Sequence, residues 1–166
     1  MRCFVVMGVS GCGKSSIGEA IADKCGMVFV DGDDLHPAAN IAKMASGTPL
    51  DDADREPWLV TIGKAMAKHD GPIVVGCSAL KRTYRDLIRA QLSEPVHFLH
   101  LDAPKEVLLD RVKSRRGHFM PAALLDSQFA TLERLCGDED GIEIDISQPF
   151  KDVVHASETY VKETVK

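Results

Sequence analysis

A glycine-rich run near the start of the chain has the residue types and the spacing needed to hold a polyphosphate. The pattern is a glycine, four free positions and then Gly-Lys-Ser, from Gly8 to Ser15. Glycines allow the backbone to curl around an anion with its N–H groups inward, and Lys14 can reach the terminal phosphates of a nucleoside triphosphate as a catalytic residue. The Ser15 hydroxyl is placed to coordinate a magnesium ion that bridges those phosphates. The predicted nucleotide-binding residues here are Gly8, Val9, Ser10, Gly11, Cys12, Gly13, Lys14, Ser15 and Ser16.

The sequence on either side of this run distinguishes a phosphate-binding loop from an ordinary strand-to-helix turn, which is the alternative for any glycine-rich run. An apolar stretch over residues 3–7 precedes the loop, and Ile17, Ala20 and Ile21 follow it at helical spacing. The helix would therefore present its positive N-terminal end to the phosphates. Strand, loop and helix come in the order that the phosphate-binding interpretation requires.

Several carboxylates follow the second apolar stretch, in Asp31-Gly32-Asp33-Asp34-Leu35-His36-Pro37. In a phosphotransferase, one carboxylate can hold the water shell of the magnesium ion while another accepts a hydrogen bond from the attacking hydroxyl. We assign Asp31 to the metal and Asp33 to the acceptor hydroxyl, because a spacing of two in an extended chain keeps both side chains on one side. Asp34 can instead cap the next helix, and His36 can either contact the acceptor substrate or begin that helix.

A second group of polar candidates follows the third apolar stretch. Ser78 and Lys81 come closest to the predicted strand end and are candidates for binding the acceptor substrate. Arg82, Arg85 and Arg89 recur at three and four residues and share one face of a predicted helix. This cationic face predicts either an anionic ligand or an ordinary solvated helix surface.

Arg55 lies in an acidic stretch, Asp51-Asp52-Ala53-Asp54-Arg55-Glu56. Its guanidinium group can clamp a substrate carboxylate with two hydrogen bonds, or it can pair with its acidic neighbours. Trp58, the only tryptophan, is predicted to belong to the core or to the wall of a pocket.

Basic residues gather again between Arg111 and His118, where no acidic residue occurs. Phosphoryl transfer spreads negative charge over the equatorial oxygens, and arginines on a closing segment can stabilise that charge while excluding water. Gly117 and the compact turn Phe119-Met120-Pro121 that follows suit a hinged lid at about residues 115–128. We assign Arg111 and Arg115 to the nucleotide and Arg116 to catalysis, although spacing alone does not decide which arginine contacts the phosphates.

Length and composition limit the class of protein. The chain has 166 residues, 45% of them hydrophobic, and a formal net charge of −5, so we expect a single domain over residues 1–166 with a substantial core. The acidic balance argues against nucleic-acid binding and favours a small-molecule substrate. Five cysteines without a Cys-x-x-Cys pair suit a reducing compartment. With neither a leader-like N-terminus nor a long apolar run, the sequence predicts a cytoplasmic protein with no membrane partner.

Short apolar runs alternate with helical patterns along the whole chain. Strands are predicted at residues 3–7, 27–30, 73–76, 96–101 and 142–146, each apolar on both faces. Helices are predicted at residues 14–24, 36–45, 55–69, 81–91, 105–115, 121–135 and 150–164. This alternation indicates an α/β architecture whose parallel sheet is covered on both sides and binds ligands at the carboxyl ends of its strands.

Two local features refine this prediction. Asp54 precedes the first turn of the third helix as a start signal, and Pro57 comes early enough not to break that helix. The acidic stretch over residues 137–141 lacks the ligand spacing of a calcium loop, so we predict a solvated turn with surface charges.

Five segments together resemble the gluconokinase family of small ATP-dependent kinases, over about residues 4–146. The phosphate loop is shared by very many nucleotide enzymes, whereas the other four segments are specific in combination. The segments are Gly8 to Ser15, Asp31 to Pro37, Gly47 to Leu59, Cys77 to Arg85, and Gly117-His118-Phe119 followed by Leu124 to Phe129.

The resemblance implies a three-layer P-loop NTPase fold with a five-stranded parallel sheet and a mobile lid, similar to that of shikimate and nucleoside-monophosphate kinases. It implies transfer of the ATP γ-phosphate to the 6-hydroxyl of D-gluconate, with ATP and Mg²⁺ as cofactors and Asp33 orienting and helping to deprotonate that hydroxyl. It also suggests Arg55, Lys81 and His118 as contacts of the sugar acid, and Gln128 as a further substrate-binding residue. Family members are often dimers, so a homodimer is an option that the sequence itself does not show.

Two alternatives from other functional classes stay open at this point. The first is a shikimate-type or nucleoside-monophosphate kinase, but the glycine triplet expected of a shikimate kinase is absent at residues 76–79. The second is a nucleotide-binding switch without catalysis, but no Asn-Lys-x-Asp segment for reading a guanine base occurs. Both absences favour the sugar-acid kinase.

Overall fold

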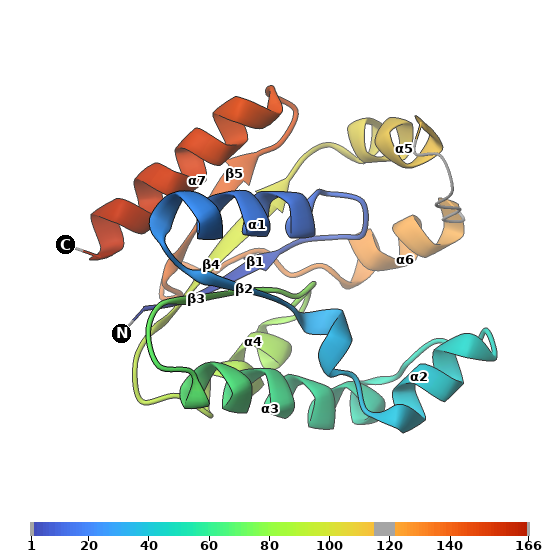
Figure 1. Cartoon of the computed structure of the whole chain (residues 1–166). Coiled ribbons are helices and arrows are strands. Elements are labelled where there is room, and N and C mark those ends of the chain that lie inside the picture. Colours follow the sequence, from blue (N-terminus) through green and yellow to red (C-terminus); the bar gives the residue numbers. More distant parts are fainter. Residues whose placement is uncertain (1, 115–121, 166) are drawn as a thin grey trace.

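Five parallel strands form one sheet in the computed structural model, which describes the backbone of residues 2–114 and 122–165 and the side chains of 2–111 and 125–165 (Figure 1). The strand order is β2-β3-β1-β4-β5. The strands are β1 Cys3–Met7, β2 Val28–Asp31, β3 Ile73–Gly76, β4 Val96–Asp102 and β5 Gly141–Asp145. After β3 the chain crosses to the other side of β1. Parallel α/β sheets bind their ligands at the carboxyl ends of the strands beside such a reversal.

The helices confirm the alternation that the sequence predicts. They are α1 Lys14–Cys25, α2 Ala38–Ala45, α3 Asp52–Lys68, α4 Arg82–Arg89, α5 Lys105–Ser114, α6 Ala122–Thr131 and α7 Phe150–Val165, with a 3₁₀ helix, η1, at Gly32–Leu35. Helix α2 begins two residues after its predicted start, because His36 precedes a proline and both His36 and Pro37 have extended backbone angles. None of the helices in the described part of the chain has the length and apolar content needed to cross a bilayer.

Helices α1 and α7 cover one face of the sheet, and α3 and α4 cover the other (Figure 1). Alternation along β1 explains why two cores form, because successive side chains point to opposite faces. Phe4 and Val6 pack in the core under α1 and α7, whereas Val5 and Met7 pack in the core under α3 and α4. All five residues of β1 are buried, so the strand that leads into the glycine-rich loop is a firmly packed anchor for the loop.

The edge strands depart from the predicted pattern. Val28 on β2 is 46% exposed, and Glu143 and Asp145 on β5 are exposed. The prediction that every strand is covered on both faces is therefore confirmed for the central strands β1 and β3 and wrong for the two edges. An edge strand has a neighbour on one side only, and polar or exposed side chains there discourage pairing with another chain.

The start of α3 is a capping box rather than the single Asp54 signal predicted from the sequence. The Asp51 carboxylate accepts a hydrogen bond from the Asp54 N–H at 2.8 Å, and the Asp54 carboxylate accepts one from the Asp51 N–H at 3.0 Å. These two bonds satisfy donors that the first helical turn leaves free. The helix therefore begins at Asp52, three residues earlier than predicted, and Pro57 is accommodated within it.

The acidic turn over residues 137–141 is not simply solvated, and this corrects the prediction. The Glu139 side chain is fully buried and accepts hydrogen bonds from Arg85 Nε at 2.7 Å and Arg85 Nη2 at 2.9 Å, as well as one from Arg89. The Arg85 side chain is also fully buried. Neither predicted role of the cationic face of α4 therefore holds for Arg85 and Arg89, because their anionic partner is the protein's own Glu139.

Candidate active site

The glycine-rich loop lies at the carboxyl end of β1, where it turns into α1. Gly8, Gly11 and Gly13 have φ angles of 146°, 84° and 92°, which side-chain-bearing residues rarely adopt. A Cβ atom at Gly8 would also lie 2.8 Å from the Leu101 carbonyl oxygen. Gly13 is the N-cap of α1 and no side chain caps the helix, so the first-turn N–H groups of α1 remain available to an anion.

Lys14 is the first residue of α1, and its ammonium group lies across the loop. Its Nζ donates hydrogen bonds to the carbonyl oxygens of Gly8 at 3.0 Å and Val9 at 3.1 Å. It forms no ion pair with any carboxylate among the described side chains, so its charge is left to neutralise a phosphate. The loop is anchored on the other side by the Gly8 N–H, which donates to the Ser78 carbonyl at 3.2 Å.

The two carboxylates predicted to act on the metal and on the acceptor hydroxyl lie at the carboxyl end of β2. Asp31 ends the strand, and the chain then turns into η1 instead of staying extended, which corrects the geometric premise of the prediction. Asp31 Oδ1 accepts a hydrogen bond from the Asp33 N–H at 3.0 Å and so caps η1. Desolvation and the neighbouring Asp31 carboxylate raise the pKa of Asp33, while Lys14 partly opposes this shift. Asp33 therefore lies close to the loop lysine in an environment typical of a group that exchanges protons.

Trp58 on α3 contacts η1 and the residue that follows it. Its indole Nε1 donates to the Gly32 carbonyl at 2.8 Å, and its ring stacks on His36 with the ring centroids 4.1 Å apart. Asn40 on α2 completes the contact by bonding His36 Nδ1 at 3.2 Å. Burial lowers the pKa of His36, so the imidazole is neutral near pH 7. The prediction that Trp58 belongs to the core or to a pocket wall is confirmed, since it is 4% exposed.

A charged cluster gathers the two cations that the resemblance assigns to the sugar acid. Asp52 accepts hydrogen bonds from the Lys81 ammonium group at 3.2 Å and from the Tyr84 hydroxyl at 2.5 Å. Arg55 Nη1 lies 3.8 Å from the same carboxylate and 3.4 Å from the Tyr84 hydroxyl. The hydrogen bonds from Tyr84 and Lys81 lower the pKa of Asp52. Two cations and a hydroxyl thus surround one carboxylate, which is the donor set that binds a carboxylate ligand.

The turn between β3 and α4 carries Ser78 and Lys81 in a strained conformation. Ala79 has a φ angle of 46°, which costs free energy for a residue with a side chain. Arg85 Nη1 donates to the Ala79 carbonyl at 2.9 Å, and Arg85 is in turn held by Glu139. The buried ion pair therefore fixes the turn that carries Ser78 and Lys81.

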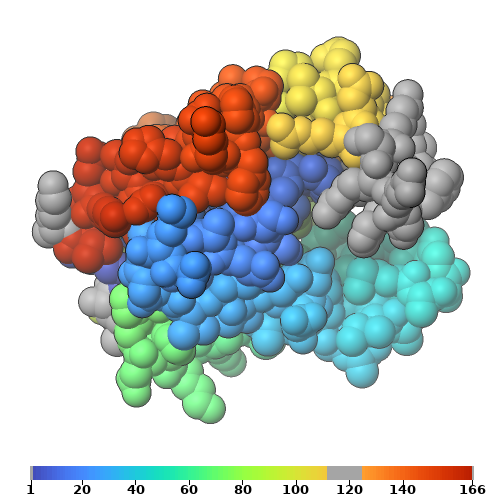
Figure 2. Space-filling model, turned by 45° about the horizontal axis from the view of Figure 1, so that its top comes forward, coloured from blue at the N-terminus to red at the C-terminus, as the bar shows by residue number. Residues whose placement is uncertain are grey.

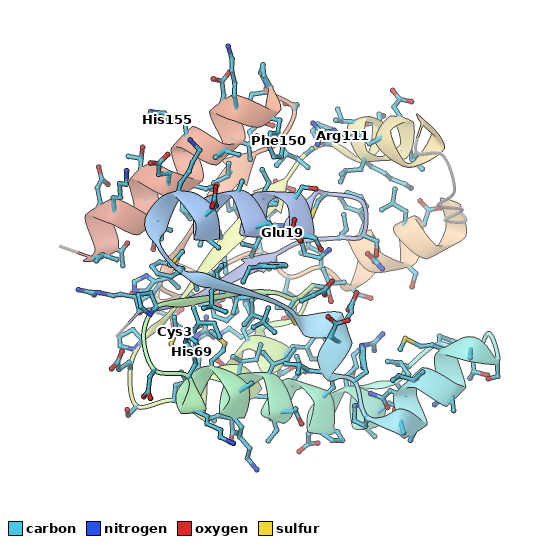
Figure 3. The ribbon with its side chains drawn as sticks, in the orientation of Figure 1. Cys3, Glu19, His69, Arg111, Phe150 and His155 are labelled. Carbon is cyan, nitrogen blue, oxygen red and sulfur yellow. The ribbon has the colours of Figure 1, made fainter. Side chains whose placement is uncertain are left out.

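A cavity of about 330 Å³ opens beside the loop on the α1 face of the sheet. Figure 3 shows Arg111 on α5 and Phe150 at the start of α7 on this side of the molecule. In the space-filling view of Figure 2, the blue loop region reaches the surface between the red α7 and the yellow α5. The cavity is lined by Gly11, Cys12, Gly13, Ser16, Ile17, Arg111, Ile146, Gln148, Phe150 and Val153. An aromatic ring, a guanidinium group and apolar side chains next to a phosphate loop fit a nucleoside.

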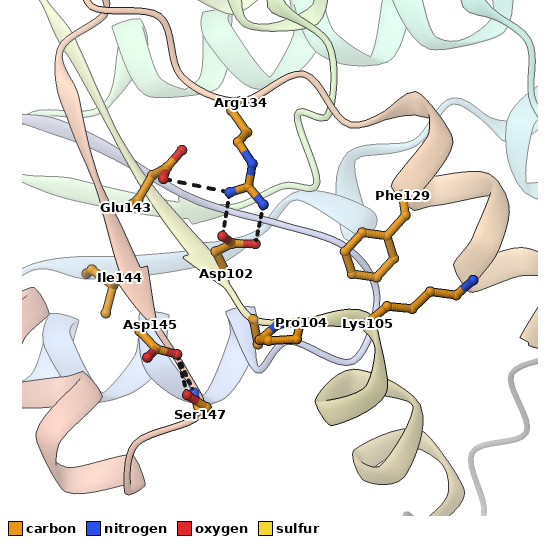
Figure 4. A pocket seen from close by; sticks show the side chains of 10 residues that line it. Asp102, Pro104, Lys105, Phe129, Arg134, Glu143, Ile144, Asp145 and Ser147 are labelled. Carbon is orange, nitrogen blue, oxygen red and sulfur yellow. Dashed lines mark hydrogen bonds and ion pairs between the residues drawn. The ribbon is translucent and has the colours of Figure 1, made fainter.

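A second cavity, of about 610 Å³, lies at the carboxyl ends of β4 and β5 (Figure 4). Its charged groups already bind one another: Arg134 pairs with Asp102 and with Glu143. Asp145 accepts a hydrogen bond from the Ser147 N–H at 2.9 Å. Because these groups are satisfied within the protein and no residue of the glycine loop lines the cavity, we do not assign it to the reaction.

Gln128, which the sequence suggests as a substrate contact, bonds the phosphate loop in this structure. Its side chain reaches from α6 to the loop and binds Ser10, with Ser10 N–H donating to Gln128 Oε1 at 2.6 Å. The predicted lid begins at residue 115, and the three basic residues assigned within it, Arg115, Arg116 and His118, lie outside the described residues. Residues 122–128 of the predicted lid form most of α6.

The donor atoms at this end of the sheet suit a hard cation held mainly by phosphates and water. Ser15 and Asp31 offer hydroxyl and carboxylate oxygens, which are the ligands that Mg²⁺ prefers. No group of three or more metal-ligating side chains occurs among the described residues. A divalent ion here would therefore depend on the nucleotide's own oxygens, as in other phosphate-loop sites.

Sequence reasoning missed several residues that the fold brings to the site. Asp52 and Tyr84 join Arg55 and Lys81 through contacts that span about thirty positions in the sequence. Gln148 and Phe150 approach the loop only because α7 packs on α1. Tyr84 follows the predicted site residue Lys81 by three positions, and this spacing could have indicated that Tyr84 belongs to the site. No local pattern identifies the second pair.

Comparison with known proteins agrees with this geometry. Residues 4–135 match a family model described as an AAA domain. The chain is 49% identical over 154 residues to the thermosensitive gluconokinase of Escherichia coli (strain K12), covering 90% of this chain and 82% of that protein.

Solved structures extend the comparison to the fold. A gluconokinase from Sinorhizobium meliloti 1021 superposes with a TM-score of 0.90 at 46% identity, covering 98% of this chain and 93% of that one. A shikimate kinase from Aquifex aeolicus superposes with a TM-score of 0.64 at 14% identity over 99% of this chain and 98% of that one, which shows a shared fold alone.

Proposed function

Because the chain belongs to the gluconokinase family, we propose that it transfers the γ-phosphate of ATP to the 6-hydroxyl of D-gluconate, giving 6-phospho-D-gluconate and ADP. The observation that carries this proposal is the high identity to named gluconokinases over nearly the whole chain. The geometry supports it independently, because a phosphate loop, a carboxylate and a pair of cations meet at one edge of the sheet. A neutral acceptor such as glucose has no carboxylate that could compete with Asp52 for the two cations.

The nucleotide is held by the loop and by the cavity beside it. The free N–H groups of the loop and of the first turn of α1 bind the phosphates, and Lys14 moves from the Gly8 and Val9 carbonyls to the terminal phosphate. Arg111 and Phe150 contact the base or ribose in the 330 Å³ cavity. A magnesium ion held through Ser15 and Asp31 would neutralise charge that develops on the phosphate oxygens.

The acceptor is held on the opposite side of the loop. Arg55 and Lys81 bind the gluconate carboxylate with help from the Tyr84 hydroxyl, in competition with Asp52, which occupies these donors in the structure. Asp33 accepts the hydrogen bond of the 6-hydroxyl and takes its proton as the oxygen attacks phosphorus. The bond from the γ-phosphorus to its bridging oxygen then breaks, and ADP leaves.

The remaining expectations belong to the same proposal. We assign residues 1–166 to one kinase domain, with Arg115, Arg116 and His118 contributing from the predicted lid. All five cysteines are unpaired, which supports a reducing, cytoplasmic location. Homodimer formation stays a prediction, for which light scattering of the purified protein is the measurement.

An acceptor panel assayed for ADP release tests the function. D-Gluconate should raise ATP turnover well above the rate with shikimate, AMP or glucose, each supplied at the same concentration. Turnover with shikimate or AMP that exceeds turnover with gluconate would assign the chain to another kinase class. ATP consumption that no acceptor stimulates would favour a nucleotide-binding switch.

A further inference from the structure

Gln128 and Ser10 form a reciprocal clasp between α6 and the phosphate loop. Ser10 N–H donates to Gln128 Oε1 at 2.6 Å, and Gln128 Nε2 donates to Ser10 Oγ at 2.8 Å. The amide orientation is fixed, because the backbone N–H can only donate and so must face the amide oxygen. Two bonds of good length across 118 positions in the sequence distinguish this contact from a chance surface interaction.

Helix α6 is a firm base for this clasp. Leu125 is 1% exposed within the core under α1 and α7, and Phe129 packs against the same core. An ion pair between Lys105 and Asp126 ties α6 to α5. Gln128 lies between these anchors in the sequence, so its side chain is held at a defined distance from the loop.

The clasp divides the loop into two halves with different tasks. In the first half, Gly8 N–H is bound by Ser78 O, and Ser10 N–H is bound by Gln128. Among the described residues, the N–H groups of Gly11 and Gly13 have no hydrogen-bond acceptor. The Cys12 N–H of the second half donates to the Val9 carbonyl at 3.3 Å. The first half is therefore fixed to the protein at Gly8 and Ser10, and the second half keeps the Gly11 and Gly13 donors for an anion.

We propose that Gln128 is a positioning residue for phosphoryl transfer that holds the first half of the phosphate loop, and that it does not contact the acceptor substrate. It acts through Ser10, by keeping the loop in the shape that receives the nucleotide phosphates. This inference rests on the proposed function only in naming the reaction, because nucleotide binding can be measured without any sugar acid. It replaces the substrate-binding role that the sequence suggests for Gln128.

The substitution Gln128→Met removes both hydrogen bonds while nearly keeping the side-chain volume. Calorimetric titration with ADP, without sugar acid, should show about 5- to 10-fold weaker binding, because the nucleotide must then order a loop that the two hydrogen bonds no longer hold in shape. The KM for gluconate should change less than about twofold. Ser127→Ala, at the exposed neighbouring position, is the matched control and should leave ADP affinity unchanged.

A raised KM for gluconate with unchanged ADP affinity would overturn the proposal and restore a substrate contact. If Gln128→Met does not fold, Gln128→Asn withdraws the same amide by one methylene and should weaken ADP binding in the same direction. A double-mutant cycle gives the second readout. Gln128→Met should cost less ADP affinity in a Ser10→Ala background than in the native chain, because part of the clasp is already gone. Strictly additive losses would contradict the clasp even if the acceptor panel confirms the kinase.

Discussion

Replacing Glu139 by glutamine should destabilise the protein far more than the adjacent change Asp138→Asn. Glu139→Gln keeps the side-chain shape but removes the negative charge that faces two arginines of α4. Glu139 and Arg85 are both fully buried and joined by two hydrogen bonds of 2.7 and 2.9 Å. The substitution therefore leaves the Arg85 guanidinium group as a buried cation without a counter-ion.

Removing one partner of a buried ion pair costs about 3 to 5 kcal/mol, because the remaining charge is desolvated and unpaired. For a chain of this length, 1 kcal/mol lowers the Tm by about 2 to 4 °C, so we expect a decrease of about 8 to 16 °C for a loss near 4 kcal/mol. Asp138 instead pairs with Arg82 at the surface, with its side chain 68% exposed. Water and salt screen such an exposed pair, so its loss should affect stability far less.

Urea denaturation of both variants, followed by circular dichroism, measures the difference directly. Glu139→Gln should lose at least about 2 kcal/mol more than Asp138→Asn. Equal losses, or a loss below about 1 kcal/mol for Glu139→Gln, would refute the assignment of Glu139 as a buried counter-ion. A reduced affinity for gluconate in Glu139→Gln would fit the link from Arg85 to the Ala79 carbonyl and so to the turn carrying Lys81.

The pH dependence of stability provides a second test of the same ion pair. Burial alone would raise the pKa of Glu139, but hydrogen bonds from Arg85 and Arg89 more than offset this and lower it to about 2. A lowered pKa in the folded state means that the unfolded chain binds more protons in this range. Glu139 therefore contributes its stability above about pH 4.5, and this is lost as the pH falls towards 2. Glu139→Gln should flatten the acid limb of the stability curve, and an unchanged acid limb would argue against the shift.

Three further predictions concern the reaction. Lys14→Ala should abolish turnover through loss of phosphate neutralisation, and a near-native kcat would count against the loop assignment. Asp33→Asn should lower kcat by about 100-fold or more with ADP affinity retained. Because the pKa of Asp33 is raised, the acid limb of the native pH–rate profile should lie above the ordinary aspartate range, and it should disappear in the variant. Trp58→Phe keeps the stacking on His36 but leaves the Gly32 carbonyl without its donor. It should lower kcat about tenfold with little change in ADP affinity. An equal loss of ADP affinity would show that Trp58 supports the whole fold rather than η1.

Much of the fold follows from local sequence patterns. The predicted ranges for β1 and β3 match the observed strands, because fully buried central strands are continuous apolar runs bounded by polar or glycine residues. The loop was equally predictable, since Gly8 and Gly13 occupy φ angles that favour glycine. The ends of helices and strands were less predictable. At the start of α3, Asp51 and Asp54 are both aspartates, so the sequence pattern does not decide which of them begins the helix.

The parts that could not be predicted depend on contacts between distant segments. Nothing in the stretch 137–141 distinguishes Glu139 from Asp138, and burial is decided by the position of Arg85 on α4. The clasp between Gln128 and Ser10 likewise depends on how Leu125 and Phe129 anchor α6 to the core under α1 and α7. For the same reason, Asp52 was missed as the carboxylate that occupies the cations of the site.

The identity of the phosphorylated atom tests the central claim most directly. The product of a complete reaction with ATP and D-gluconate should be purified and examined by phosphorus–proton correlation NMR. We predict that phosphorus couples to the pair of methylene protons on C6, and that this product fails to accumulate with Asp33→Asn. Coupling to a single proton of a secondary alcohol, or release of inorganic phosphate without an organic phosphate, would contradict the account.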